Sequence, residues 1–357
     1  MALFAKSPAK IRLLVLGTGG MAAAHAAAFA SDPRCEMVGT VDVVPGRAAE
    51  FAKKFGIAKH FTDLDKAIAW GQFDAAANVT PDPIHHPTTM KLLAAKKHVF
   101  CEKPLAENFT LADEMARAAD KAKLINMVNL TYRNVAAIHA AKKLVDSGQL
   151  GEIRHVEASY RQSWLVSNAW GAWDKEDKWL WRLSEAHGSK GVLGDVGIHI
   201  LDFMSFATGM MPVSLQARLK TFHKAPGDKI GKYVLDANDS AVMSVELPND
   251  ALGVIQASRF NTGHGNELHL RIFGNKGAVE VKHMEGWTEC QACLGEDVNT
   301  FAWRPIKAEP VETNYRKFIN AIVARKNGDP DFRRAADLQM LLDMCFTADA
   351  SHAMNLR

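Results

Sequence analysis

The sequence has few of the features that mark membrane, secreted or nucleic-acid-binding proteins. No apolar run approaches the ~20 residues that a membrane-spanning helix needs. Its 43 basic and 40 acidic residues nearly balance, so it lacks the strong positive charge typical of proteins that bind nucleic acids or anionic membranes. The stretch Met1–Lys10 has no apolar core of the kind found in secretory signals. We therefore expect a cytoplasmic protein.

Cysteine is scarce as well, with five residues in 357. An odd number in a long chain does not indicate a disulfide framework. Cys290 and Cys293 form one CxxC, whereas a structural zinc site would need a second pair at similar spacing. We therefore expect no bound metal.

Short apolar runs alternate with helical patterns in the first third of the chain. The expected strands are Ile11–Leu16, Met37–Asp42, Phe73–Thr80, His98–Cys101 and Ile125–Leu130. The expected helices are Gly20–Ala30, Pro45–Phe55, Ile84–Lys97 and Leu111–Lys123. Such alternation predicts βαβ units, which form a parallel sheet with helices on both faces.

The pattern changes after about residue 150, where strand-like runs follow one another. The expected strands are Ile153–Trp164, Val213–Phe222, Ser240–Leu247, Gly253–Phe260, Leu268–Gly274 and Ala278–His283. The expected helices are Val192–Ala207, Asn314–Arg325 and Ala335–Met354. Neighbouring strands without intervening helices predict a mostly antiparallel sheet. We expect an α/β protein with a doubly wound domain over 1–130 and an α+β domain over 131–357.

A glycine-rich turn follows the first expected strand. The run Gly17-Thr18-Gly19-Gly20-Met21-Ala22 fits the GxGxx(G/A) pattern and opens a helix. Gly17 permits a tight turn, Gly19 lets the backbone approach a pyrophosphate, and Ala22 keeps the helix close to the sheet. The free N–H groups at the start of the helix attract phosphate. We predict a dinucleotide site that is contacted by Gly17, Thr18, Gly19, Gly20 and Met21.

Asp42 ends the second expected strand, about twenty residues after the glycine run. A carboxylate there accepts hydrogen bonds from both ribose hydroxyls of the adenosine half and repels a 2′-phosphate. We therefore predict NAD as the cofactor rather than NADP. The alternative is that Asp42 is an ordinary turn residue. Arg47 lies nearby and would suit a 2′-phosphate, but we interpret it as a solvated helix residue.

Lys103 belongs to the run Glu102-Lys103-Pro104, which follows the strand His98–Cys101. The carboxyl ends of strands in a doubly wound sheet line the ligand crevice, so Lys103 is expected beside the substrate. A lysine there donates a hydrogen bond to the reacting oxygen. Taken alone, Lys103 would be interpreted as a surface lysine at a strand end.

A second chemical motif, Gly194-Asp195-Val196-Gly197-Ile198-His199, lies in the expected helix Val192–Ala207. Asp195 and His199 are four residues apart, which places them on one helix face. A histidine beside a carboxylate is a suitable acid–base group, because the carboxylate orients the ring and raises its pKa. Asp202 is an alternative partner, and a simple helix-face ion pair is an alternative interpretation.

Together these motifs resemble the Gfo/Idh/MocA oxidoreductase family, which includes glucose–fructose oxidoreductase and inositol dehydrogenases. The resembling segments are Gly17–Ala22, Asp42, Thr80–His85, Cys101–Ala106, Tyr132–Arg133, Ser147–Gly151, Trp181–Arg182 and Gly194–His199. The resemblance implies an N-terminal Rossmann domain and a C-terminal substrate-binding domain with an open sheet. It also implies a homodimer or homotetramer joined through that sheet.

The resemblance implies roles for individual residues too. The family's catalytic lysine, aspartate and histidine map to Lys103, Asp195 and His199, which would also contact the substrate. Further cofactor contacts would come from Thr80, Pro81, His85, Glu102, Lys103, Arg133, Trp181 and Arg182.

Tryptophan is concentrated in one segment, because five of the eight lie between residues 164 and 181. Indole faces pack against the C–H faces of sugar rings. We predict further substrate contacts from Arg161, Trp164 and His264. Most of the tryptophans are instead expected in the core or in a subunit interface.

These observations predict an NAD-dependent oxidoreductase that moves a hydride between nicotinamide and a secondary hydroxyl, or ketone, of a sugar, sugar derivative or cyclitol. One alternative is an NADP-linked reductase, which Asp42 disfavours, or an oxidoreductase with a tightly bound cofactor. Another is a non-catalytic NAD-binding regulator, which would not need Lys103, Asp195 and His199 together. Neither nucleic acid nor membrane is expected as a partner.

Overall fold

The computed structural model describes residues 10–351 and divides them into two compact units. Unit 1 contains the described residues up to Leu130 together with Glu312–Gln339, and unit 2 contains Thr131–Val311 and the described residues from Met340 onward. The expected second domain, 131–357, is corrected accordingly. Residues 312–339 return to unit 1 because Phe318 packs into its core with Phe100.

Two expectations concern residues at the ends of the chain. Met1–Ala9, most of the stretch considered as a signal, lies outside the described residues. The same holds for the end of the expected helix Ala335–Met354 beyond Ser351. None of the helices between residues 10 and 351 combines the length and the apolar character that crossing a bilayer requires.

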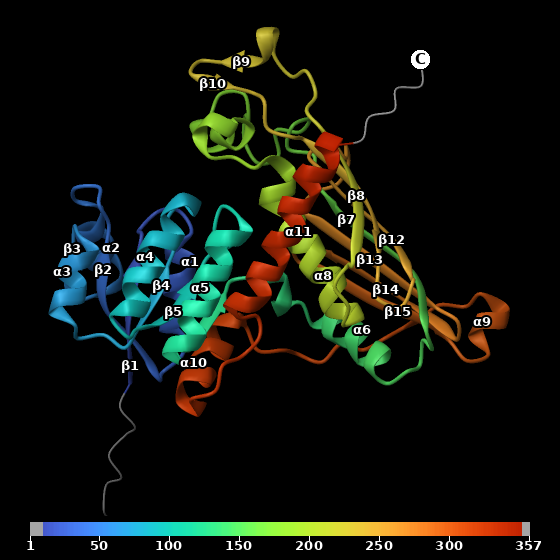
Figure 1. Cartoon of the computed structure of the whole chain (residues 1–357), viewed down its shortest axis with the longest axis horizontal. Coiled ribbons are helices and arrows are strands. Elements are labelled where there is room, and N and C mark those ends of the chain that lie inside the picture. Colours follow the sequence, from blue (N-terminus) through green and yellow to red (C-terminus); the bar gives the residue numbers. More distant parts are fainter. Residues whose placement is uncertain (1–9, 352–357) are drawn as a thin grey trace, which may run out of the picture. The chain divides into compact units, whose positions relative to one another are not determined.

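Unit 1 is a doubly wound sheet of six parallel strands flanked by helices (Figure 1). Its strands are β1 (Ile11–Leu16), β2 (Cys35–Val41), β3 (Lys59–Phe61), β4 (Ala75–Asn78), β5 (His98–Cys101) and β6 (Asn126–Val128), in the order β3-β2-β1-β4-β5-β6. Its helices are α1 (Ala22–Ala30), α2 (Arg47–Phe55), α3 (Leu64–Trp70), α4 (Asp82–Ala94), α5 (Phe109–Ala122) and α10 (Asn314–Ala324). The strand order reverses between β1 and β4, and such folds bind ligands at the carboxyl ends of the strands there.

The sequence did not predict β3 and α3. The three residues of β3 include none that is fully buried, so no apolar run marks it. Helix α3 is capped by Asp63, whose carboxylate accepts a hydrogen bond from the N–H of Asp65 at 2.8 Å. This aspartate is a typical cap, but the helix after it is only seven residues long and lacks a clear period.

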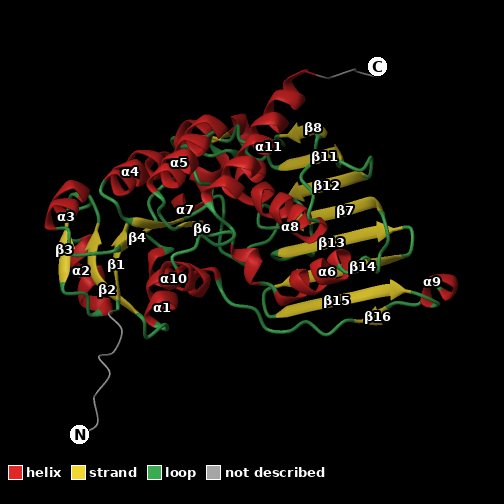
Figure 2. Ribbon diagram, turned by 60° about the horizontal axis from the view of Figure 1, so that its bottom comes forward, coloured by secondary structure: helices red, strands yellow, loops and turns green. Residues whose placement is uncertain are grey.

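Unit 2 is built on an eight-stranded sheet against which α6 (Ala136–Asp146) and α8 (Ile198–Thr208) pack (Figure 2). Its strands are β7 (Ile153–Arg161), β8 (Ser214–Lys220), β11 (Ser240–Glu246), β12 (Leu252–Ser258), β13 (Glu267–Gly274), β14 (Gly277–Met284), β15 (Trp287–Leu294) and β16 (Arg304–Pro305), in the order β16-β15-β14-β13-β7-β12-β11-β8. Neighbouring strands are antiparallel except β7 and β12, which are parallel. The predicted fold class is thereby confirmed.

Smaller elements complete unit 2. A separate hairpin is formed by β9 (Lys229–Ile230) and β10 (Tyr233–Val234). The remaining helices are α7 (Asp177–Leu180), α9 (Asp297–Thr300) and α11 (Phe332–Ser351), the last being divided between the two units. Strand β15 carries both Cys290 and Cys293, which are buried free thiols. Side chains three apart on a strand point to opposite faces, so this CxxC does not converge on one ion.

The expected helix Val192–Ala207 is two elements. Leu193–Gly197 forms a π-helical turn, and α8 follows directly. A π-helix has more residues per turn than an α-helix, so the four-residue spacing of Asp195 and His199 no longer implies one shared face. Gly194 is required in this turn, because a Cβ there would lie 2.3 Å from Cβ of Lys190.

Candidate active site

The glycine loop between β1 and α1 combines a tight turn with open space. Gly17 has a φ of +86°, and a Cβ on it would lie 2.6 Å from the carbonyl oxygen of Val79. Beside Gly19 and Gly20, a Cβ would meet no atom within 4 Å. The residues present therefore fit a dinucleotide, since the loop leaves room for a pyrophosphate near the N-terminus of α1.

Asp42 holds this loop together. One carboxylate oxygen accepts hydrogen bonds from the N–H and the Oγ1–H of Thr18, at 2.9 and 2.6 Å. The other accepts from the N–H of Val44 at 2.9 Å. Burial would raise the pKa of Asp42, but these hydrogen bonds outweigh it and lower the pKa. The carboxylate is therefore negatively charged at neutral pH. Arg47 is exposed at the first position of α2.

Glu102, which precedes Lys103, is fixed by two buried neighbours. Its Oε1 hydrogen-bonds to Nε2 of His25 at 2.6 Å and accepts from Nδ2 of Asn129 at 2.7 Å. Its Oε2 accepts the N–H of Lys103 at 3.1 Å. Burial would raise the pKa of Glu102, but the hydrogen bonds from His25 and Asn129 outweigh it and lower the pKa to about 2. No motif in the sequence identifies His25 or Asn129.

His85 fixes the other side of the Lys103 turn. Its Nδ1 lies 2.8 Å from the carbonyl oxygen of Pro104, and its Nε2 lies 2.8 Å from that of Thr80. A carbonyl only accepts hydrogen bonds, so both ring nitrogens must carry a proton. Burial disfavours this charge, but Cys101, Asp82 and the Pro104 carbonyl outweigh it and raise the pKa of His85 to about 10. The imidazolium therefore joins the two loops that follow β4 and β5.

In unit 2, Asp195 lies among arginines. Its Oδ2 is 3.3 Å from Nη2 of Arg259 and 4.0 Å from Nε of Arg182. The guanidinium of Arg182 packs 4.6 Å from the ring centre of Trp181, so the predicted pair Trp181 and Arg182 lies beside Asp195. The sequence did not predict Arg259, which follows β12 without any surrounding motif.

His199 is largely buried on the first turn of α8. The ring of Tyr132 meets it edge-on, with ring centres 5.0 Å apart. The hydroxyls of Tyr132 and Tyr160 are hydrogen-bonded to each other, and both contact the amide of Asn266. Burial raises the pKa of both tyrosines, so they remain neutral hydrogen-bond donors at physiological pH. Tyr160 and Asn266 were not predicted.

Two predicted substrate residues share one acidic neighbour. Glu267 accepts a hydrogen bond from Nη1 of Arg161 at 3.0 Å and lies 2.8 Å from Nδ1 of His264. Trp164 is placed differently, because it is buried in an aromatic cluster and stacks on Trp179 with ring centres 5.1 Å apart.

Arg133 forms a buried, bidentate ion pair with Asp202. Nε and Nη2 donate to the two carboxylate oxygens at 2.7 and 2.8 Å. The guanidinium also packs 3.9 Å from the ring centre of Phe206. Asp202 was the alternative partner of His199 in the sequence analysis. Its charge is compensated by Arg133. The cofactor contact of Arg133 stays a prediction.

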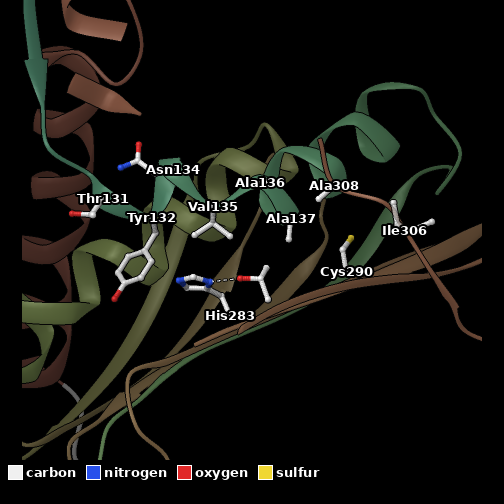
Figure 3. A pocket seen from close by; sticks show the side chains of 11 residues that line it. Thr131, Tyr132, Asn134, Val135, Ala136, Ala137, His283, Cys290, Ile306 and Ala308 are labelled. Atoms are coloured by element: carbon white, nitrogen blue, oxygen red, sulfur yellow. Dashed lines mark hydrogen bonds between the residues drawn. The ribbon is translucent and has the colours of Figure 1, made fainter. Parts of the chain in front are cut away.

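A pocket of about 590 Å³ lies in unit 2 between the start of α6 and the strands β14 and β15 (Figure 3). Tyr132 and His283 line it, and none of the residues predicted to bind cofactor or substrate does. Tyr132 contacts His283 as well as His199, with ring centres 5.6 and 5.0 Å apart. Figure 3 shows the side chains of Tyr132 and His283 next to each other among the residues that line the pocket.

Both parts of the chain match models of known families. Residues 11–130 match an oxidoreductase family with an NAD-binding Rossmann fold, and residues 138–280 match the GFO/IDH/MocA C-terminal domain. Together with the doubly wound sheet and its glycine loop, these matches define an NAD-binding oxidoreductase. The chain belongs to the Gfo/Idh/MocA family, as its motifs predicted.

Individual relatives cover most of the chain. Levoglucosan dehydrogenase from Pseudarthrobacter phenanthrenivorans is 26% identical over 305 residues, which are 79% of this chain and 76% of that protein. Inositol 2-dehydrogenase from Rhizobium meliloti is 26% identical over 76% of each chain. The crystal structure of an oxidoreductase domain protein from Kribbella flavida is 29% identical, covers 96% of this chain and 98% of that one, and has a TM-score of 0.84.

Proposed function

We propose that this chain is an NAD-dependent dehydrogenase that oxidises a secondary hydroxyl of a sugar, sugar derivative or cyclitol, or reduces the corresponding ketone. The observation that carries the proposal is the match of two relatives, named for levoglucosan and for inositol, to about three quarters of the chain. Lys103 lies within the matched range 11–130, and Asp195 and His199 lie within 138–280.

The proposed chemistry assigns one role to each of these three residues. Bound NAD would accept the hydride from the carbon. His199, in its neutral form, takes the hydroxyl proton, and Asp195 stabilises the imidazolium that results. Lys103 donates a hydrogen bond to the reacting oxygen. Its turn is well suited to this role, because Glu102 and Pro104 are held by the buried side chains of His25 and His85.

Other residues complete the proposed sites. Cofactor contacts are proposed for Gly17–Met21, Asp42, Thr80, Pro81, His85, Glu102, Arg133, Trp181 and Arg182. Arg161 and His264 are better placed for substrate than Trp164, because their side chains are 27% and 36% exposed whereas Trp164 is 3% exposed.

We also propose a homodimer or homotetramer joined through the sheet of unit 2. Burial alternates along β11 and β12, and one face presents Val242, Leu252 and Val254 about half exposed. Apolar side chains on an open sheet face favour association. A cytoplasmic location is proposed because the five cysteines are free thiols.

The test is a panel of sugars, sugar acids and inositols with NAD and with NADP, followed by the absorbance of the reduced nicotinamide. Lys103→Ala and His199→Ala should still bind NAD and lose about 10²–10⁴-fold in kcat with the best substrate. Full activity in either variant would remove that residue from the mechanism. Preference for NADP would favour the reductase alternative, and NAD binding without turnover on any polyol would favour a regulator.

A further inference from the structure

One guanidinium in unit 2 is completely enclosed. The side chain of Arg259 has an exposed fraction of 0%. Its Nη2 lies 3.3 Å from Oδ2 of Asp195, and its Nη1 donates to the carbonyl oxygen of Arg182 at 3.0 Å. Its central carbon lies 4.9 Å from the ring centre of Trp164. Arg259 therefore contacts the π-helical turn, Trp164 at the start of the tryptophan-rich segment and Arg182 directly after its end.

A buried arginine needs a compensating negative charge. Asp239 is one neighbour, but its Oδ2 receives the ammonium of Lys224 at 2.6 Å and the N–H of Phe222 at 2.8 Å. Both side chains of that pair are buried, so Asp239 and Lys224 balance each other. Asp195 is therefore the carboxylate that balances Arg259. Burial lowers the pKa of Arg259 while Asp195 raises it, and an arginine remains charged in either case.

We infer that Arg259 is a positioning residue that fixes the Asp195 carboxylate and, through it, sets the basicity of His199. The inference rests on the proposed function. Arg259 attracts the charge of Asp195, and this competes with the stabilisation that the carboxylate gives to the imidazolium of His199. Because the same guanidinium holds the Arg182 carbonyl and the face of Trp164, it also ties the acid–base pair to the segment expected to contact substrate.

The other groups around Asp195 do not replace this cation. Arg182 lies farther away, at 4.0 Å, and is about one third exposed, so water screens its charge. The negative charge of Asp195 further raises the pKa values of Tyr132 and Tyr160, so both tyrosines stay neutral. Loss of Arg259 should therefore strengthen the effect of Asp195 on His199.

The experiment compares Arg259→Gln, Arg259→Lys, Asp195→Asn and the double variant Asp195→Asn/Arg259→Gln with the wild type. Arg154→Gln, an exposed arginine on β7, is the control. In a plot of kcat/KM against pH, we expect Arg259→Gln to shift the rising limb to higher pH by about one unit. Asp195→Asn should shift the limb to lower pH. Arg259→Lys should fall between the wild type and Arg259→Gln. NAD affinity should stay within about twofold in all variants, because neither Asp195 nor Arg259 is among the proposed cofactor contacts.

The double variant decides whether Arg259 acts through Asp195. In the Asp195→Asn background the loss of Arg259 should add less than about twofold in kcat/KM, and the pH profile should match that of Asp195→Asn alone. Additive losses, or an unmoved limb in Arg259→Gln, would overturn the inference. If Arg259→Gln does not fold, the double variant and Arg259→Lys still give the comparison, since the first removes both charges and the second keeps the cation.

A titration of the His199 imidazole by NMR separates this inference from the proposed function, because it needs no turnover. If no polyol reduces NAD but the His199 titration still moves upward in Arg259→Gln, the proposed reaction fails and the Arg259–Asp195–His199 coupling holds. If the wild type oxidises a sugar and the His199 titration does not move in Arg259→Gln, the proposed reaction holds and the coupling fails.

Discussion

Gly17 and Gly19 lie two residues apart in one loop, yet the structure predicts different consequences when each is replaced by alanine. At Gly17 the backbone has φ +86°, and the new Cβ would lie 2.6 Å from the carbonyl oxygen and 2.8 Å from the carbonyl carbon of Val79. At Gly19 the Cβ would meet no protein atom within 4 Å. The first glycine is required by the fold, whereas the second is required only if a ligand approaches the loop.

The magnitudes follow from these two environments. An alanine forced into a left-handed conformation costs about 1–2 kcal/mol, and pushing backbone atoms aside in a packed site adds about 1–3 kcal/mol. Gly17→Ala should therefore lower the stability of unit 1 by roughly 2–4 kcal/mol and its Tm by roughly 5–15 °C. Gly19→Ala should leave Tm unchanged without ligand. It should weaken NAD binding about 10–100-fold, because a phosphate held at a distance loses one charged hydrogen bond of about 1.5–3 kcal/mol.

Thermal unfolding with and without NAD, together with calorimetric NAD titration, measures both effects. Gly46→Ala is a suitable control for backbone strain, because Gly46 has φ +85° but no atom within 4 Å of its Cβ position. A Gly17→Ala protein as stable as the wild type would refute the steric argument. A Gly19→Ala protein with unchanged NAD affinity would show that the pyrophosphate does not approach this loop.

Three further predictions concern charge. Asp42→Ala should narrow the preference for NAD over NADP, measured as the ratio of kcat/KM values, and a wild type that prefers NADP would contradict the role of Asp42. Asp195→Asn should shift the rising limb of the oxidation rate to lower pH and leave the Kd for NAD nearly unchanged, as steady-state profiles and titration would show. Glu102 has a pKa lowered from 4.5 to about 2, so its contribution of about 3 kcal/mol is present above pH 4.5 and lost as the pH falls toward 2. Glu102→Gln should therefore lower Tm at pH 7 and flatten its fall in acid, and an unaltered acid dependence would contradict this.

Most strands of the two sheets were predictable, because a buried strand appears in the sequence as a short run of apolar residues. Leu13, Leu14 and Val15 of β1 are fully buried, and the apolar run that contains them marked the strand. β15, by contrast, was not predicted, because its apolar residues do not alternate regularly along Trp287–Leu294. Residues 312–339 were assigned to the wrong unit for a different reason. A helical period shows that a face is buried but not against which partner.

Arg259 and Asn266, which were not predicted, reach the site because strands distant in the sequence pair with each other. β12 runs parallel to β7 with Ser258 opposite Arg161, and this register carries the next residue, Arg259, to the beginning of the tryptophan-rich segment. Asn266 reaches the tyrosines because β13 pairs with β7, with Glu267 opposite Arg161. No spacing rule within one segment contains this information, since each of these contacts joins residues at least 64 positions apart.

The buried charges of unit 2 distinguish Asp195 from the other two acidic residues that pair with a buried cation. Lys224 pairs with Asp239 and Arg133 pairs with Asp202, and in both pairs the two side chains are at most 3% exposed. Arg259 pairs with Asp195, whose side chain is 29% exposed. In the first two pairs the carboxylate is enclosed together with its cation, so the two charges compensate each other inside the fold. In the third pair the cation is enclosed and the carboxylate is not, so Asp195 is held by Arg259 and remains accessible to a second partner. The difference in exposure also distinguishes Asp195 from Asp202 as a partner for His199, whereas their spacing from His199 in the sequence did not.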